Sequence, residues 1–121
     1  MSQPESTSQD ILPAWVDSSH IQGMLRGIER ESLRMQSSGF LSQAGHPQAL
    51  GSALTHPHIT TDYSEALMEF ITPPQGSIGE ALDYLRDIHA VAHRHLEHDE
   101  KLWPLSMPCM LEIGRASCRE R

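Results

Sequence analysis

The chain has 121 residues, 38% of them hydrophobic, which is enough for one modest domain and too short for an enzyme that binds three substrates. Its formal charge is −7 with only nine Lys and Arg, so a nucleic-acid surface is excluded and divalent cations are favoured as partners. The start of the chain lacks the basic and apolar regions of a secretory signal. No apolar run approaches the roughly 20 residues that span a bilayer. A cytoplasmic location is therefore expected.

The first part of the chain is predicted to be poorly structured. Residues 1–10 are rich in Ser, Gln, Pro and Glu, so they can bury too little apolar surface to become ordered. From Ile11 to Leu25 the apolar positions predict an amphipathic helix, interrupted near Asp17, where a capping sequence begins.

The next segment, residues 28–35, is predicted to be a strand. Side chains alternate between the two faces of a strand, which places Glu29 and Glu31 on one face and Arg30 and Arg34 on the other. Both faces are therefore mixed in polarity, and this pattern leaves open which face is buried.

Further strands follow a long loop. Residues 36–39 are predicted to form a turn, and the Gly-, Pro- and His-containing loop at 45–57 is a candidate edge of a functional site. Residues 58–62 and 66–72 are predicted to be strands. The second of these is expected to stop at the Pro-Pro-Gln-Gly sequence of residues 73–76.

The clearest helix is predicted from Ser77 to about Asp99. Ser77 is well placed as its N-cap, and Glu80 completes a Ser-x-x-Glu capping box. The helix is expected to cover one face of the sheet. Its apolar stripe consists of Ile78, Leu82, Leu85, Ile88, His89, Ala92 and Leu96.

Acidic residues inside the predicted strands are the candidates for chemistry. Glu29 and Glu31 share a face and can bind or bridge cations, and Mg²⁺ prefers such oxygen ligands. Asp62 and Glu69 lie in or beside the later strands, and Glu69 stands between Met68 and Phe70, where an unpaired carboxylate is costly to bury. The alternatives are a salt bridge from Glu69 to an arginine of the first strand, or an edge strand whose Glu69 face meets water.

Histidine and cysteine offer weaker candidates. His89 and His93 have helical i, i+4 spacing, but a closed zinc site needs four ligands, and His89 is expected to be a hydrogen-bonded core residue. His95 and His98 fall on the polar face of the helix. Cys109 has no nearby feature that would lower the pKa of its thiol, so it is expected to be buried and structural. The segment that precedes it supplies two expected core or strand residues, Trp103 and Met107.

Four segments together closely resemble the amino-terminal part of the proteobacterial glutamate-cysteine ligases. They are Gly-Ile-Glu-Arg-Glu-Ser-Leu-Arg at 27–34, Leu-Gly-Ser-Ala-Leu-Thr-His at 50–56, the acidic run at 60–73, and Trp-Pro-Leu-Ser-Met-Pro-Cys at 103–109. The resemblance implies an α+β fold with a partial antiparallel sheet of a glutamine-synthetase-like funnel and flanking helices.

The resemblance also implies a division of the chain. Residues 11–111 would be an N-terminal fragment of the ligase catalytic domain, inactive without the remainder of the chain. Residues 112–121, which include Cys118, depart from the family pattern and resemble a translated sequencing adapter, so they are expected to be a non-native tail.

The ligand assignments likewise follow from the resemblance. Glu31, Asp62 and Glu69 would hold one Mg²⁺ or Mn²⁺, and Glu29 would contribute to a neighbouring ion beside the transferring phosphate. Glu65 fits the same acidic run, with its role left open. The implied reaction uses ATP to form γ-glutamyl phosphate from L-glutamate and then joins it to L-cysteine, the first step of glutathione biosynthesis. Another hypothesis is a free-standing acidic metal-binding or partner-binding module without catalysis.

Overall fold

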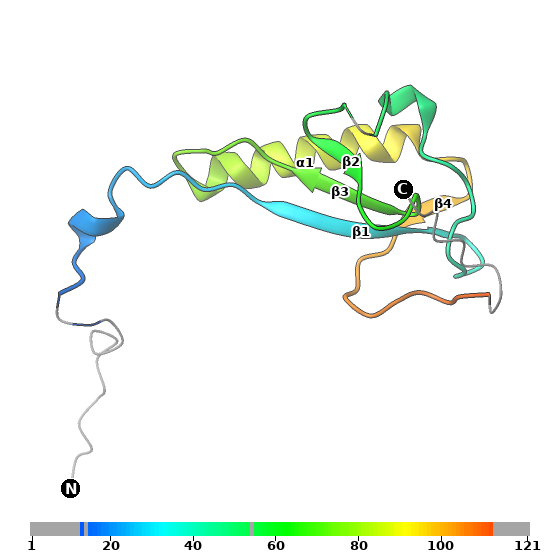
Figure 1. Cartoon of the computed structure of the whole chain (residues 1–121), viewed down its shortest axis with the longest axis horizontal. Coiled ribbons are helices and arrows are strands. Elements are labelled where there is room, and N and C mark those ends of the chain that lie inside the picture. Colours follow the sequence, from blue (N-terminus) through cyan, green and yellow to red (C-terminus); the bar gives the residue numbers. More distant parts are fainter. Residues whose placement is uncertain (1–12, 14, 54, 113–121) are drawn as a thin grey trace, which may run out of the picture.

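A computed structural model of the chain describes residues 13, 15–53 and 55–112. Within them, four strands form one antiparallel sheet in the order β2-β3-β1-β4 (Figure 1). The elements in chain order are η1 (a 3₁₀-helix, Ser18–Ile21), β1 (Glu29–Gln36), η2 (a 3₁₀-helix, Gln48–Leu50), β2 (Ile59–Thr61), β3 (Leu67–Ile71), α1 (Ile78–His95) and β4 (Glu100–Leu102). The predicted strands at 28–35, 58–62 and 66–72 are thus confirmed within one or two residues at each end.

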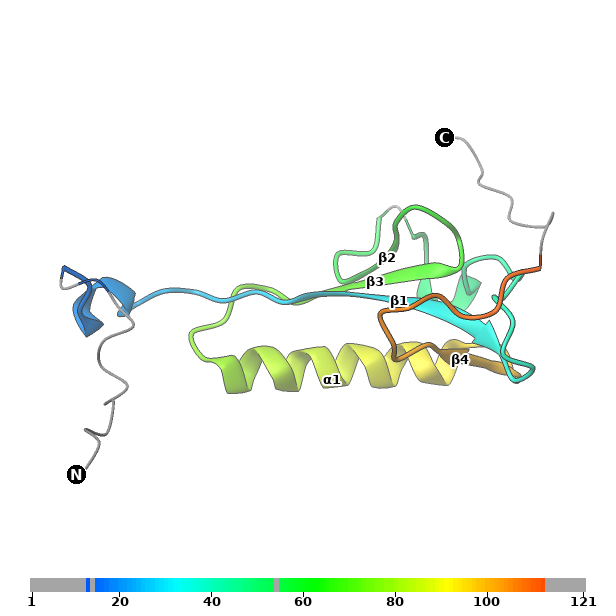
Figure 2. The ribbon, with the colours of Figure 1, turned by 90° about the horizontal axis from the view of Figure 1, so that it is seen from below.

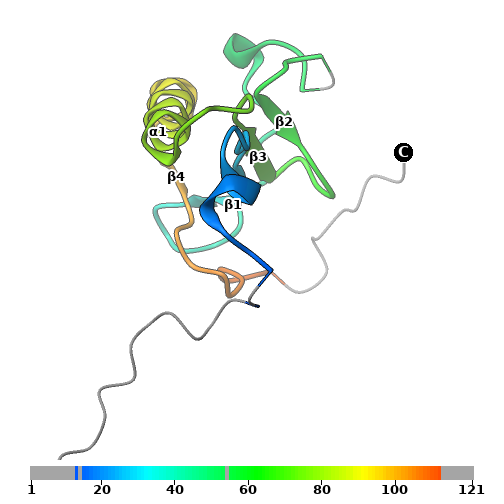
Figure 3. The same ribbon diagram turned by 90° about the vertical axis from the view of Figure 1, so that its left-hand side faces the viewer.

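Helix α1 covers one face of the sheet (Figures 2 and 3). Met68 and Phe70 of β3 are fully buried on that face, together with Ile59 of β2. They pack with Ile88 and Ala92 of α1 in a single apolar cluster. Because strand side chains alternate, the residues between these buried positions lie on the opposite face, which α1 leaves uncovered.

The start of α1 follows the predicted capping chemistry. The Ser77 hydroxyl accepts the Glu80 backbone N–H at 3.2 Å, and the Glu80 carboxylate accepts the Ser77 backbone N–H at 3.1 Å. The helix ends at His95, four residues before the expected Asp99, because Leu96 is already extended. No helix among the described residues is both long and apolar enough to cross a membrane.

The prediction of an amphipathic helix at 11–25 is wrong for the described residues of that range. The only helical turn there is η1, whose N-cap Asp17 accepts the Ser19 backbone N–H at 2.7 Å. Gly23 then adopts a φ of +76°, which a continuing α-helix does not allow. Met24 and Leu25 remain exposed, so no packing favours a longer helix. Residues 1–12 and 14 lie outside the described residues, including the segment predicted to be disordered.

The segment after α1 differs from expectation in two ways. The short strand β4 pairs antiparallel with the end of β1, and no sequence pattern predicted it. Trp103 and Met107, expected to be core or strand residues, lie outside the strands. Met107 is 64% exposed, and Trp103 is half-buried and donates its indole N–H to the Met107 carbonyl at 2.6 Å. Cys109 is buried as expected, and burial raises the pKa of its thiol. Of the predicted non-native tail, only Glu112 belongs to the described residues.

Candidate functional site

The four predicted metal ligands lie on the sheet face opposite α1, here called the acidic face: Glu29, Glu31, Asp62 and Glu69. Glu31 of β1 is directly opposite Glu69 of β3, and Glu29 lies two residues back along the same face. Asp62 directly follows β2, and its backbone N–H donates to the Leu67 carbonyl at 3.2 Å, which continues the β2–β3 pairing. Because Asp62 is two residues beyond Thr60, which pairs with Glu69, strand alternation places it on the same face, and its charge contributes to the raised pKa of Glu69. The structure therefore places the four carboxylates, which come from three segments of the chain, on one surface.

The acidic face is electrostatically unfavourable for its own carboxylates. Burial raises the pKa of Glu69, and the charges of Glu29, Asp62 and Glu31 raise it further. Like charges directly opposite each other in a sheet are destabilising, as Glu31 and Glu69 are here. Ion pairs to these four carboxylates from Arg, Lys or His are absent from the described part of the chain. A cation from solution would relieve this repulsion.

The salt-bridge alternative for Glu69 is not what the structure shows. Arg30 pairs with the buried Phe70, so it lies on the core face of β1. Arg34 is four residues further along the same strand, and strand alternation places it on that face as well. Arg34 is fully buried and forms its ion pair with Glu100 of β4 at 2.8 Å. The sheet thus separates both arginines from the acidic face.

The donor set fits a hard divalent cation. Magnesium prefers carboxylate oxygens, keeps several waters and is commonly held by one or two carboxylates together with substrate phosphates. Across residues 13, 15–53 and 55–112, no three His, Cys, Asp or Glu side chains converge closely enough to enclose an ion. The acidic face is therefore an open surface and not an enclosed site within the described residues.

A shallow hollow of about 430 Å³ adjoins one end of the acidic face. Glu29 is the one charged residue in its lining, and the Thr72 hydroxyl beside it accepts the Ile28 backbone N–H at 2.8 Å. The residues that line the hollow are Gly27, Ile28, Glu29, Ile71, Thr72 and Pro74.

Histidine behaves as the sequence predicted. His89 is half-buried, its ring centroid lies 4.2 Å from that of Phe70, and its Nδ1 lies 3.0 Å from the Leu85 carbonyl oxygen. Burial lowers the pKa of His89, which favours the neutral ring. His95 is exposed on α1 as expected, whereas His98, expected on the polar face of the helix, is exposed in the segment after the helix ends.

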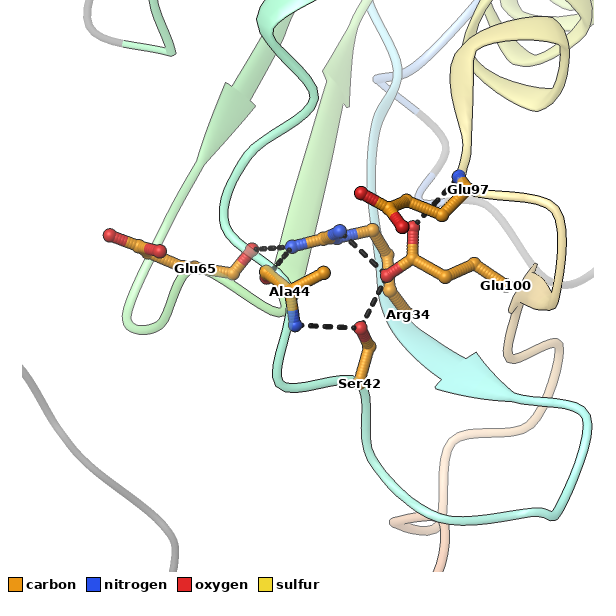
Figure 4. A network of polar contacts seen from close by, with 6 residues as sticks. All are labelled: Arg34, Ser42, Ala44, Glu65, Glu97 and Glu100. Carbon is orange, nitrogen blue, oxygen red and sulfur yellow. Dashed lines mark hydrogen bonds and ion pairs between the residues drawn. The ribbon is translucent and has the colours of Figure 1, made fainter.

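A buried polar network lies on the face of β1 opposite the acidic face, and no sequence pattern predicted it (Figure 4). Arg34 is its centre, and Glu100 is its charged partner. Both side chains are buried, and the Ser42 hydroxyl donates to the same Glu100 oxygen that Arg34 contacts. The one signal in the sequence was Arg34 itself, a cation inside a predicted strand.

Comparison with known proteins identifies the relatives of this chain. A model of the glutamate-cysteine ligase family matches residues 11–116. A glutamate-cysteine ligase from Yersinia pseudotuberculosis is 56% identical over 92 residues, which cover 76% of this chain and 18% of that protein. The chain thus spans about a fifth of the length of this relative.

Two solved structures share the fold. The glutamate-cysteine ligase of Francisella tularensis, determined in complex with AMP, has a TM-score of 0.71 and 42% identity, and the match covers 73% of this chain and 18% of that one. A bifunctional glutathione synthetase from Pasteurella multocida has a TM-score of 0.66 and 39% identity over 68% of this chain and 11% of that one. These matches confirm the expected α+β class and the partial sheet of a glutamine-synthetase-like fold. Since the family model matches most of the chain, this protein belongs to the glutamate-cysteine ligase family.

Proposed function

We propose that this chain is the N-terminal part of an ATP-dependent ligase that joins the γ-carboxyl group of L-glutamate to the amino group of L-cysteine. This reaction is the first step of glutathione biosynthesis. The observation that carries the proposal is the acidic face, with Glu31 opposite Glu69 and no cationic partner for either among the described residues. Family membership and the AMP complex of the Francisella relative support it.

The proposed reaction needs a site that gathers negative charge. The side-chain carboxylate of glutamate takes the γ-phosphoryl group of ATP, and the amino group of cysteine then attacks the γ-glutamyl phosphate and releases phosphate. Bound Mg²⁺ or Mn²⁺ supplies charge neutralisation for the triphosphate. We assign Glu31, Asp62 and Glu69 to one cation and Glu29 to a neighbouring one. Because no three of these side chains converge in the described residues, the assignment requires their side chains to move toward the ion when it binds. The paired strands β1 and β3 keep the backbones of Glu29, Glu31 and Glu69 in a fixed register, and Asp62 follows directly after β2.

The proposal extends to the setting of the chain. Residues 11–111 are the fragment of the catalytic domain, residues 112–121 are a non-native tail, and the remainder of the ligase supplies the other parts of the site. The protein is cytoplasmic, and its small-molecule substrates are L-glutamate, L-cysteine and ATP.

A chimera tests the proposal. Residues 11–111 of this chain replace the matching segment of the Yersinia ligase, and phosphate release from ATP is measured with and without cysteine. We expect cysteine-dependent turnover, reduced about 10-fold or more by Glu69→Gln, because loss of a group that only orients a metal ligand already costs about 10–100-fold. The control variant Asp87→Asn removes an exposed carboxylate of α1 and should leave turnover unchanged.

The same experiment addresses the metal-binding module. A module without catalysis would give an inactive chimera, and its affinity for Mg²⁺ would not respond to ATP. Magnesium titrations of the chain with and without ATP provide this second readout. An inactive chimera with ATP-independent Mg²⁺ binding would refute the ligase proposal.

A further inference from the structure

We propose that Arg34 is a positioning residue of the acidic face. Its buried guanidinium fixes the turn between β2 and β3, here called the β2–β3 turn (residues 62–66), against β1. In this way it sets where Asp62 lies relative to Glu31 and Glu69. The inference rests on the proposed function for the role of the acidic face, whereas the structural contact itself is independent of that function.

Arg34 holds the β2–β3 turn from two sides. Its Nη2 donates to the Glu65 carbonyl at 2.8 Å, and its backbone N–H donates to the Ala66 carbonyl at 2.7 Å. Asp62 is only three residues before Glu65, and Glu69 is four residues after it. The side chain and the backbone of Arg34 therefore both bind the segment that connects Asp62 to Glu69.

The same guanidinium joins two further segments (Figure 4). Nη2 also donates to the Ala44 carbonyl at 2.6 Å, and Nη1 donates to the Glu100 carboxylate at 2.8 Å. The third nitrogen, Nε, has no partner among the described residues. Arg34 has no exposed surface, so water does not compete for these bonds. Two loops and the strand β4, which are far apart in sequence, thus meet on one side chain.

Glu100 is held as firmly as Arg34. Its Oε1 accepts the Ser42 hydroxyl as well as Arg34, and its Oε2 accepts the Glu97 backbone N–H at 3.1 Å. Ser42 in turn accepts the Ala44 backbone N–H at 3.1 Å. These bonds satisfy the carboxylate and fix the direction from which it contacts the guanidinium, so that the fork of Arg34 has one orientation.

Geometry rather than net stability explains this arrangement. A buried ion pair often contributes no more to stability than apolar residues of the same volume would, so Arg34 and Glu100 need another reason to be buried. Arginine presents its donors in a rigid planar fork, which lysine cannot reproduce. Because Arg34 and Glu31 are three residues apart on one strand, the fork ties the β2–β3 turn to the strand that carries Glu29 and Glu31.

Hydrogen exchange on the 121-residue chain without metal tests the contact. We expect Arg34→Met to increase the exchange rates of the Asp62 and Leu67 amides about tenfold or more, as expected when a local opening becomes easier. The amides of α1 should keep their rates. Arg34→Lys keeps a positive charge next to Glu100 but lacks the planar guanidinium. We expect it to speed exchange of the Asp62 and Leu67 amides as Arg34→Met does. Ile88→Val, a mild change in the core, serves as the control for general loosening.

Metal dependence in the chimera tests the consequence. For Arg34→Lys we expect the Mg²⁺ concentration for half-maximal rate to rise about 10–100-fold, with the KM for cysteine unchanged, as for other groups that orient metal ligands. If Arg34→Lys leaves both the exchange rates and the Mg²⁺ dependence as in wild type, then the only role of Arg34 is to neutralise Glu100, and the inference fails. It also fails if the turn is released without any change in Mg²⁺ dependence.

Two further outcomes are separable. Should the Arg34 variants not fold, Glu100→Gln keeps the shape of the network and removes one charge. It is expected to speed exchange of the same turn amides to a smaller degree, and unchanged rates would overturn the inference. An inactive wild-type chimera would refute the proposed ligase function, while the exchange experiment would still decide whether Arg34 holds the turn.

Discussion

At the scale of single residues, Glu69 has the most perturbed environment of the acidic face. It stands opposite Glu31, it is half-buried, and three other carboxylates contribute to its raised pKa. A raised pKa in the folded state means that the native chain binds a proton at Glu69 more tightly than the unfolded chain does. Ionised Glu69 therefore lowers stability above its folded pKa, and this penalty disappears as the pH falls below the ordinary value of 4.5.

Glu69→Gln is accordingly expected to stabilise the metal-free chain near pH 7.5. The gain should be about 0.2–1 kcal/mol, the range for cross-strand pairs. The difference between variant and wild type should vanish below pH 4.5, because Gln does not titrate and Glu69 is then neutral. Urea unfolding between pH 4 and 8 measures both quantities. Asp87→Asn should show no such pH dependence, and a less stable Glu69→Gln at pH 7.5 would contradict the prediction.

At the scale of elements, α1 depends on its N-terminal cap. The Ser77 hydroxyl accepts one orphan backbone N–H, and Glu80 accepts another. We expect Ser77→Ala to cost about 1 kcal/mol of unfolding free energy, since an alanine cap leaves a donor unpaired. Urea unfolding followed by circular dichroism measures it. Ser77→Asp should remain close to wild type, and equal losses for both variants would show that the cap is not responsible.

The elements also show which features the sequence could predict. Local rules were sufficient for α1 and for the paired carboxylates, because capping and strand alternation involve residues within a few positions of one another. The helix expected near the N-terminus failed because amphipathic spacing stabilises a helix only where something covers its apolar face. Ile21 and Leu25 have no such cover among the described residues.

The Arg34 network was beyond local rules for a different reason. Both faces of β1 carry charges, so alternation alone cannot say which face is buried. The partner of Arg34 is 66 residues away in sequence, on a strand of only three residues. Neither the ion pair nor β4 leaves a periodic pattern, and only the assembled sheet brings them together.

At the scale of the whole molecule, much of the apolar surface has no partner within the described residues. The N-terminal arm (residues 15–25) extends away from the sheet (Figure 1), and it exposes 53% of Ile21, 50% of Met24 and 65% of Leu25. The sheet ends in short edge strands, β2 on one side and β4 on the other. Open edges and exposed apolar side chains favour association between chains.

The isolated chain is therefore expected to self-associate and to lack ligase activity. Sedimentation velocity over a wide range of concentrations should show concentration-dependent association, weakened by Met24→Gln combined with Leu25→Ser, because these changes remove apolar surface from the arm without touching the sheet. Phosphate release from ATP should stay at background with glutamate and cysteine present, since the acidic face alone supplies no enclosed site. A chain that stays monomeric at high concentration would show that the N-terminal arm does not mediate self-association. Cysteine-dependent phosphate release from the same sample would show that the described fold already carries a complete active site.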